Sequence, residues 1–363
     1  MPKRGGGHIE LGLGQPRTPC DDDDADLLLH STDRPSGRRG AGAGAAMRFV
    51  VRKVAQLLIV LLCVTFLSYL LLELLPGDPA TRICAGQGGQ ECVDQKRAEL
   101  HLDDPVPVRY VRWLGGVVTG DFGVSARNAQ PVSEALAQRI PVTIELLLYS
   151  QFIALIVAVP LGVLAARRSG GVLDRSASII LFALLAVPNF MMALLLILIF
   201  PVKLGLFQAS GYTKFTDNPL ASLGSLFLPA LTLAVAEMAV YMRLMRTDLI
   251  ATLQQDYITM ARAKGMSPRR VLFGHAFKPS TFSLITVIGL NFGRLIGGAL
   301  VVETIFAING LGGYTVVGVF GQDYIPVQGA IVVIACGYVL INFAVDMLYA
   351  VLDPRIRHAR ALA

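Results

Sequence analysis

Residues 256–272 read DYITMARAKGMSPRRVL, and they lie between two long apolar runs. The part before Gly265 holds good helix formers with basic residues at its end, and a glycine just after such a part is typical of a helix C-terminus. Ser267 and Pro268 then form a pair that is favoured at the start of a helix. The stretch therefore predicts a helix, a break at Gly265 and a second helix. The alternative is a solvated basic loop without fixed structure.

Six apolar stretches surround this segment. They cover residues 52–75, 140–166, 176–203, 223–245, 281–303 and 327–351. About 20 apolar residues cross a bilayer as a helix, and backbone amides in hydrocarbon need internal partners. Each stretch therefore predicts a transmembrane helix, and Pro160 and Pro188 predict kinks in two of them. The expected fold class is an all-α membrane protein with six transmembrane helices.

The composition agrees with this reading. Of the 363 residues, 54% are hydrophobic and 16% are charged, whereas soluble domains carry about 25% charged residues. The net charge of +6 does not indicate a nucleic-acid partner, because the basic residues fall in short segments between apolar runs. The composition favours a chain that crosses the lipid bilayer repeatedly.

The distribution of basic residues predicts the orientation. Four short segments carry most of them: the one before the first apolar run, the loops after the second and fourth runs, and the tail after the sixth. These segments fall on one side if the helices alternate, and short basic loops stay in the cytoplasm. We therefore expect cytoplasmic N- and C-termini, a cytoplasmic loop at 246–280 and an extracytoplasmic loop at 76–139.

The two ends of the chain differ from its middle. Residues 1–46 are rich in Gly and Asp and predict a disordered tail without a signal peptide. Met47 opens a basic segment before the first apolar run, so translation from Met47 is an open alternative to translation from Met1. The expected organisation is a helix at 47–75, the loop domain at 76–139, helices two to six at 140–351 and a cytoplasmic tail at 352–363.

Two of the five cysteines share the long outer loop. Cys84 and Cys92 flank three glycines, which bend freely. Disulfides persist on the oxidising side of a membrane, so the two residues are expected to form a disulfide. Two free thiols, or a metal site that includes His101, are the alternatives.

Two charges fall inside apolar runs, Glu237 in the fourth and Arg294 in the fifth. A central arginine costs roughly 2.5–3.5 kcal/mol on insertion scales, so it is expected to face a cavity or a partner. In one interpretation Glu237 and Arg294 form a structural pair. In the other, both line the translocation pathway, where Arg294 binds a substrate carboxylate and Asn291 adds hydrogen bonds.

The basic loop resembles the cytoplasmic signature loop of ABC importer permeases, and more narrowly the dipeptide/oligopeptide/nickel class. The resemblance begins with Tyr257, Ala261-Arg262-Ala263-Lys264-Gly265 and Arg270-Val271-Leu272. Further matches extend over residues 47–357. They include Pro76-Gly77-Asp78-Pro79, Gly120-Asp121-Phe122-Gly123, Thr143-Ile144-Glu145-Leu146, Pro160-Leu161-Gly162, Glu303-Thr304-Ile305-Phe306, Gly310-Leu311-Gly312, Asp323-Tyr324 and Pro326-Val327-Gln328-Gly329.

The resemblance implies a type I ABC importer permease fold, with a folded extracytoplasmic loop between helices one and two that is typical of the first of two permease subunits. It implies that one group of loop residues couples the chain to an ATPase. This group is Asp256, Tyr257, Ala261, Arg262, Ala263, Lys264, Gly265 and Met266. Two departures are Thr259, where the general signature is acidic, and Pro279, where a polar residue is expected.

The implied partners are a second permease subunit, two ATPase subunits that carry ATP and Mg²⁺, and an extracytoplasmic binding protein, in the cytoplasmic membrane of a prokaryote. The implied substrate is a di- or oligopeptide, with nickel or another small solute as the alternative. The chain is not expected to be an enzyme, because it lacks a phosphate-binding loop, a His-Glu-x-x-His motif and a Gly-x-Ser-x-Gly motif. A secondary transporter is the rival reading, although internal repeats are not evident.

Overall fold

The computed structural model of the chain describes residues 41–73, 80–81, 84, 89–99 and 101–352. Within these residues the only pairing of the β type is an isolated bridge between Val124 and Pro131. Five of the described helices are long and apolar enough to cross a membrane, and a sixth crossing results if one bent pair counts as a span. The all-α membrane fold is therefore confirmed. The expected tails lie outside the described residues at 1–40 and 353–363.

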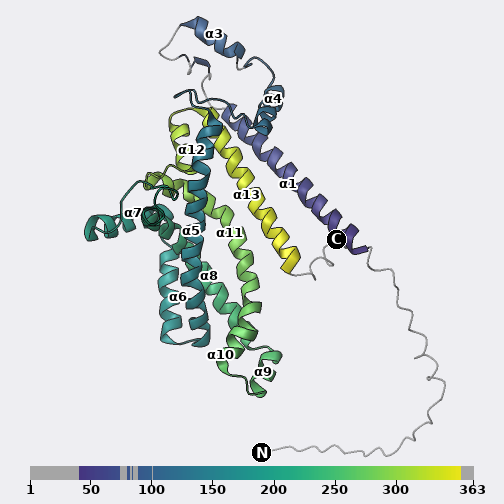
Figure 1. Cartoon of the computed structure of the whole chain (residues 1–363), viewed down its shortest axis with the longest axis vertical. Coiled ribbons are helices and arrows are strands. Elements are labelled where there is room, and N and C mark those ends of the chain that lie inside the picture. The colour runs from purple at the N-terminus through teal and green to yellow at the C-terminus, as the bar shows by residue number, and fades with distance from the viewer. Residues whose placement is uncertain (1–40, 74–79, 82–83, 85–88, 100, 353–363) are drawn as a thin grey trace, which may run out of the picture. The chain divides into compact units, whose positions relative to one another are not determined.

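The described chain is a succession of helices, shown in Figure 1. They are α1 (Ala41–Glu73), α3 (Gln90–Glu99), α4 (Val106–Thr119), α5 (Val132–Arg167), α6 (Val172–Leu185), α7 (Asn189–Ile197), the π-helix η2 (Leu198–Lys203), α8 (Pro219–Leu253), α9 (Asp256–Ala263), α10 (Pro268–Arg270), the π-helix η3 (Val271–Ala276), α11 (Phe277–Ile305), α12 (Leu311–Phe320) and α13 (Tyr324–Leu352). Helix α1 begins upstream of Met47, within the Gly/Ala run that the sequence places in the tail.

Several helices extend beyond the apolar runs. Helix α5 begins at Val132, inside the expected outer loop 76–139, and α8 continues to Leu253, inside the expected inner loop 246–280. Both extensions bury apolar side chains, such as Leu136 in α5 and Leu249 in α8. Packing of these turns against neighbouring helices keeps them helical where hydropathy alone ends the span.

The third span is broken at Pro188. Helices α6 and α7–η2 meet at an angle of 103°. Helix α6 ends at Leu185, and Pro188, with an extended ψ of 146°, is the N-cap of α7. Pro160, for which the sequence also predicts a kink, lies inside the uninterrupted α5. Of the two prolines at which kinks are predicted, only Pro188 therefore interrupts its span.

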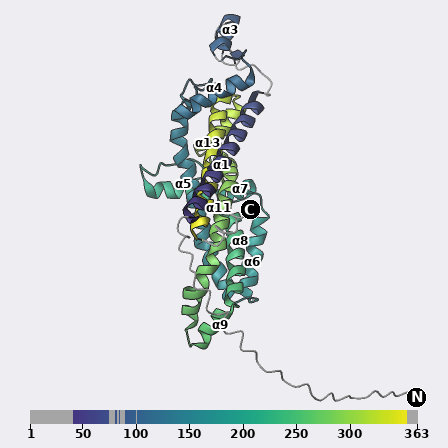
Figure 2. The ribbon, with the colours of Figure 1, turned by 90° about the vertical axis from the view of Figure 1, so that its right-hand side faces the viewer.

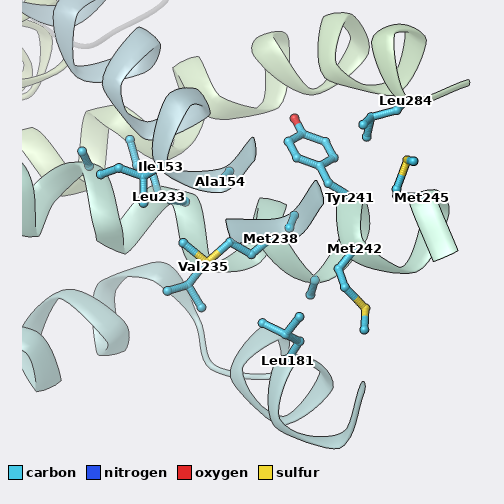
Figure 3. Packing of buried hydrophobic residues seen from close by; sticks show 14 of the residues in the cluster. Ile153, Ala154, Leu181, Leu233, Val235, Met238, Tyr241, Met242, Met245 and Leu284 are labelled. Atoms are coloured by element: carbon cyan, nitrogen blue, oxygen red, sulfur yellow. The ribbon is translucent and has the colours of Figure 1, made fainter. Parts of the chain in front are cut away.

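Helix α8 lies at the centre of the apolar core. It packs against α5, α6, α7 and α11, and Figure 3 shows Met238, Tyr241 and Met242 of α8 among side chains from the neighbouring helices. Helix α5 approaches α8 closely at Gly162, where a Cβ would lie 3.0 Å from the Met242 carbonyl oxygen. This glycine permits backbone contact between two long spans.

The two ends of the bundle carry different elements. Figure 1 shows α9 and α10 at one end of α8 and α11, and α12 at the other end of α11, and Figure 2 shows α9 at the same end from the side. Helices α11, α12 and α13 pack on one another and on α5. A functional group on α9 is thus connected to the opposite end of the bundle through the continuous length of α11.

Helix α1 packs on α4 through polar and aromatic groups. The Thr65 and Tyr110 hydroxyls lie 2.8 Å apart, and the Phe66 and Tyr110 rings meet edge to face with centroids 5.1 Å apart. Elsewhere α1 exposes apolar side chains, including Ile59 and Leu67. This exposure fits a helix that is covered by lipid or by another subunit.

Candidate functional site

The predicted helix–break–helix forms one unit at the end of α8. We call residues 256–270 the elbow: it consists of α9, the turn 264–267 and α10. The elbow is shorter than the expected loop 246–280, because α8 continues to Leu253 and α11 begins at Phe277. All eight residues that the resemblance assigns to ATPase coupling lie in α9 or in the turn.

The turn is fixed by backbone hydrogen bonds. Gly265 has a φ of +78°, a left-handed conformation that glycine adopts without strain. Its N–H donates to the Arg262 carbonyl at 2.9 Å, and the Met266 N–H donates to the Ala261 carbonyl at 3.3 Å. This pair of bonds is the Schellman arrangement that ends a helix at a glycine. The second helix begins at Pro268 with Ser267 as its N-cap, although the Ser267 side chain makes no capping bond.

The elbow is anchored by a small apolar inner face. Ile258 and Ala261, one turn apart on α9, are buried in the main core cluster together with Val271 and Leu272 of η3. Helix α9 contacts η3, so the first arm of the elbow packs against the helix that follows its second arm. Burial of an Ile side chain stabilises by about 1.5–3 kcal/mol, which holds α9 as an ordered element.

The outer face of the elbow is apolar and basic. Tyr257 is 46% exposed and Met260 61% exposed, and Phe273 of η3 is 59% exposed. The cations of the elbow are also exposed; they are Arg262, Lys264, Arg269 and Arg270. Exposed aromatic and Met side chains next to basic groups suit a protein interface better than a solvated loop.

The elbow is continuous with a span. Helix α10, η3 and α11 run as one stretch, Pro268–Ile305. The Ser280 hydroxyl donates to the Thr252 hydroxyl at 3.0 Å, which ties the start of α11 to the end of α8. The elbow, α8 and α11 can therefore act as one rigid element.

An ion pair that the sequence reasoning missed braces the same end. Arg246 of α8 binds both carboxylate oxygens of Asp174, with Nε–Oδ1 at 2.5 Å and Nη2–Oδ2 at 2.7 Å. The Gly170 N–H also donates to Asp174. Asp174 is buried at the start of α6. The sequence signal for this ion pair is Asp174 itself, an acidic residue in the first turn of a helix that follows a basic loop.

The three intramembrane residues come together between α8 and α11. Arg294 Nη2 donates to Glu237 Oε1 at 3.0 Å, and Asn291 Nδ2 donates to Glu237 Oε2 at 2.5 Å. Asn291 and Arg294 lie one turn apart on α11, so both reach the same carboxylate. The geometry satisfies both oxygens of Glu237, and its side chain is only 3% exposed.

A second polar pair extends this cluster into α5. The Tyr241 hydroxyl donates to Gln151 Oε1 at 2.9 Å. Tyr241 lies one turn after Glu237 on α8, and both side chains are buried. The mid-membrane cluster, residues Gln151, Glu237, Tyr241, Asn291 and Arg294, thus joins three spans.

A buried carboxylate connects α5, α11 and α12. Glu303 accepts hydrogen bonds from the Thr143 hydroxyl at 2.7 Å and from the Gly313 N–H at 3.0 Å. The Leu311 N–H donates to Thr143 at 2.9 Å. The carboxylate and the threonine hydroxyl therefore cap the first turn of α12, where N–H groups lack partners within the helix.

The loop before α5 is held by Asp323. Its carboxylate accepts from the Ser125 hydroxyl at 2.5 Å and from the Ala126 N–H at 3.2 Å. On the loop before α8, the Tyr212 hydroxyl donates to Glu145 of α5 at 2.7 Å. Burial raises the pKa of Tyr212 to about 12, with the Glu145 carboxylate as a second cause.

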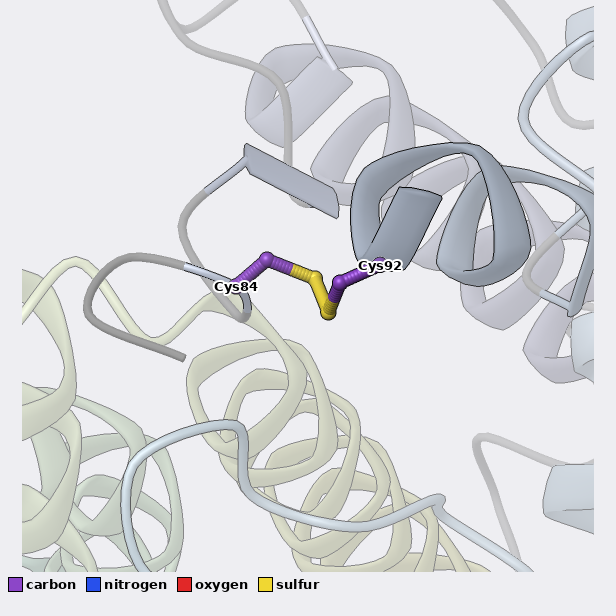
Figure 4. Close-up of a disulfide and its surroundings, with 2 residues drawn as sticks. All are labelled: Cys84 and Cys92. Carbon is purple, nitrogen blue, oxygen red and sulfur yellow. A yellow bond between two sulfur atoms is a disulfide. The ribbon is translucent and has the colours of Figure 1, made fainter. Parts of the chain in front are cut away.

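Cys84 and Cys92 form a disulfide in the structure, shown in Figure 4. Their Cα atoms lie 6.0 Å apart, and Cys92 belongs to α3. The crosslink joins the start of α3 to a residue that hydrogen-bonds back to Ala80. It restrains a short segment of the loop between α1 and α5.

Two family models together match most of the chain. Residues 158–358 match the model of the binding-protein-dependent transport system inner membrane component. Residues 46–147 match the model of the N-terminal part of such membrane components.

Named relatives are similar over nearly their full length. A putative peptide transport system permease protein of Brucella abortus (strain 2308) is 40% identical over 309 residues, which cover 85% of this chain and 98% of the relative. The oligopeptide transport system permease protein AppB of Bacillus subtilis is 39% identical over 314 residues, covering 85% and 99%. The dipeptide transport system permease protein DppB of Escherichia coli (strain K12) is 33% identical over 339 residues, covering 86% and 100%.

Proposed function

Since the chain belongs to the family of binding-protein-dependent transport system inner membrane components, we propose that it is one transmembrane subunit of an ATP-driven peptide importer. The relatives are named for peptides, dipeptides and oligopeptides, which favours a peptide over nickel as the substrate. The long segment between α1 and α5 supports the assignment to the first of two permease subunits.

The elbow is the observation that carries this function. Its inner face is anchored by Ile258 and Ala261, and its outer face exposes Tyr257 and Met260. A transporter without its own nucleotide site needs a rigid element that receives motion from another protein. An anchored element with an exposed apolar and basic face, continuous with a span, meets that requirement.

The proposed partners follow from the separation of ATP hydrolysis, on other subunits, from transport through this chain. Two ATPase subunits bind ATP and Mg²⁺ and hydrolyse the ATP, so this chain is not the enzyme. A second permease subunit completes the pathway, and a binding protein delivers the peptide from outside. The exposed apolar faces of α1 and α11 provide surface that the second permease subunit can cover.

The proposed mechanism is alternating access. Closure of the ATPase pair displaces the elbow, and α8 and α11 move with it because Pro268–Ile305 is one continuous stretch. The Asp174–Arg246 ion pair makes α6 move with α8. ATP hydrolysis then returns the assembly to the inward-facing state.

The proposed location is the cytoplasmic membrane of a prokaryote, with both termini and the elbow on the cytoplasmic side. The support for this orientation is the placement of basic residues, since the elbow and the α5–α6 turn carry exposed arginines and lysines. The disulfide-containing segment then lies on the oxidising side, where the bond persists.

The test is uptake by proteoliposomes that contain this chain, the second permease subunit, the ATPases and the binding protein. We expect a labelled peptide to accumulate inside the vesicles when the binding protein is outside and ATP is enclosed in the lumen, which then corresponds to the cytoplasm. Replacement of the phosphate-binding lysine in the ATPases should abolish it. Peptide accumulation that continues with the inactive ATPases would favour a secondary transporter.

A further inference from the structure

The exposed face of α11 carries a cation near the middle of an apolar span. The Arg294 side chain is 60% exposed on this chain, whereas the Glu237 side chain that it contacts is 3% exposed. The carboxylate therefore lies underneath and the guanidinium lies at the surface. The mid-membrane cluster presents its positive end outward.

This position does not suit a lipid contact. At 1.5 Å per residue, Arg294 lies about 16 Å along the axis from the end of α11 at Ile305. Only arginines near the ends of a span extend their charge to the membrane surface, and central ones face the protein interior or a water-filled cavity. The exposed face around Arg294 therefore borders the interior of the assembly.

The surroundings of Arg294 leave space for a ligand. One turn further along α11, Gly297 has no atom within 4 Å of the position of a Cβ. Tyr338 of α13 lies against Gly293, the residue before Arg294, and is 45% exposed. An exposed cation beside an open glycine position leaves room for the charged end of a short peptide.

The chemistry of the mid-membrane cluster indicates which functional group of a ligand it would bind. A guanidinium has five N–H donors in a planar fork that matches a carboxylate. One donor on Nη2 is directed to Glu237, which orients the side chain, and Asn291 fixes the other oxygen of Glu237. A carboxylate arriving at the exposed edge of Arg294 would meet donors that are already positioned.

We propose that Arg294 binds the C-terminal carboxylate of the transported peptide inside the pathway, and that Glu237 and Asn291 are positioning residues for the guanidinium. This inference rests on the proposed peptide-import function. It assigns a specificity for free carboxyl termini to the permease itself, in addition to any specificity of the binding protein.

The main test uses the complete transporter in vesicles and two probes, trialanine and trialanine amide, each at a concentration that saturates the binding protein. The double variant Glu237→Gln/Arg294→Gln removes the cation without leaving a buried carboxylate unpaired. Loss of a charge-assisted hydrogen bond predicts that the preference for the free acid falls about tenfold. Glu237→Gln alone should keep a preference, and Arg175→Gln, which removes an exposed cation at the start of α6, should match the wild type.

The outcomes separate the two proposals. If the wild type transports trialanine and the double variant keeps the wild-type preference, the carboxylate site is refuted while peptide import stands. If the wild type accumulates no peptide in an ATP-dependent way, the proposed function itself fails, and the inference fails with it.

A second measurement covers a double variant that does not assemble. Arg294→Cys, in a chain with Cys20→Ala, Cys63→Ala and Cys336→Ala, should react with a charged, water-soluble thiol reagent and should be protected by trialanine. A thiol that does not react in the complete transporter would place Arg294 in a closed contact with the second subunit and would overturn the proposal.

Discussion

Replacement of Gly265 by tryptophan separates the docking of the elbow from its folding. Gly265 has a φ of +78°, and no atom lies within 4 Å of its Cβ position. A non-glycine residue in this conformation costs about 1–2 kcal/mol, and the ring meets no atom of this chain near the backbone. The turn keeps its backbone hydrogen bonds, and Ile258 remains buried, so Gly265→Trp should insert and fold.

The effect on a docked ATPase should be larger. The indole projects from the turn between α9 and α10, where the proposed partner lies. Overpacking of a closely fitted contact costs about 1–3 kcal/mol, which corresponds to roughly a fivefold to more than a hundredfold loss of docking affinity. We therefore expect a normal amount of Gly265→Trp in the membrane and a loss of at least about fivefold in the ATPase activity that loaded binding protein stimulates.

The assay compares ATPase stimulation and peptide uptake in proteoliposomes for several glycine variants. Gly265→Asn carries a side chain that tolerates the left-handed region, and it should retain most of the coupling. Gly205→Trp is the matched control, because Gly205 has a φ of +64° and an equally open Cβ position but lies in the α7–α8 loop. Normal coupling in Gly265→Trp, or equal losses in Gly265→Trp and Gly205→Trp, would refute the reasoning.

Three further predictions concern the contacts that hold the helices. Thr143→Val should lower the free energy of unfolding by about 1–3 kcal/mol, because it leaves the Leu311 N–H without its acceptor. Thermal unfolding in detergent measures this change, and an unchanged transition temperature would contradict the role of Thr143 as a cap. Arg246→Gln should destabilise by about 3 kcal/mol, since it leaves Asp174 buried and unpaired, and Asp174→Asn/Arg246→Gln should recover part of the loss; a double-mutant cycle without coupling would rule out the ion pair. Mass spectrometry without reduction should detect a peptide pair linked through Cys84 and Cys92, and two separate free-thiol peptides would exclude the bond. Removal of this disulfide costs about 2–3 kcal/mol by loop entropy.

The spans could be predicted from the sequence because their composition alone separates them from the loops. The elbow could also be predicted, since Gly265, Ser267 and Pro268 act through local backbone preferences. The 103° break at Pro188 was expected only as a kink, because a proline indicates where a helix is weak but not how its neighbours redirect it.

The contacts between spans could not all be predicted. The pairing of Glu237 with Arg294 could be predicted as one of two interpretations, because isolated charges in apolar runs are rare. In contrast, Thr143 with Glu303 and Asp174 with Arg246 are joined by tertiary packing across more than 70 residues, and the sequence does not state which helix faces which. The same holds for the ends of α5 and α8, where packing continues a helix beyond its apolar run.

Photo-crosslinking from the elbow in intact cells tests the central claim most directly. A photoreactive phenylalanine derivative at Met260, which is 61% exposed, should crosslink to an ATPase subunit, whereas the same group at Phe320, which is 86% exposed at the opposite end of the bundle, should not. Crosslinks to the ATPase from position 320 and none from position 260 would contradict both the proposed orientation and the role of the elbow.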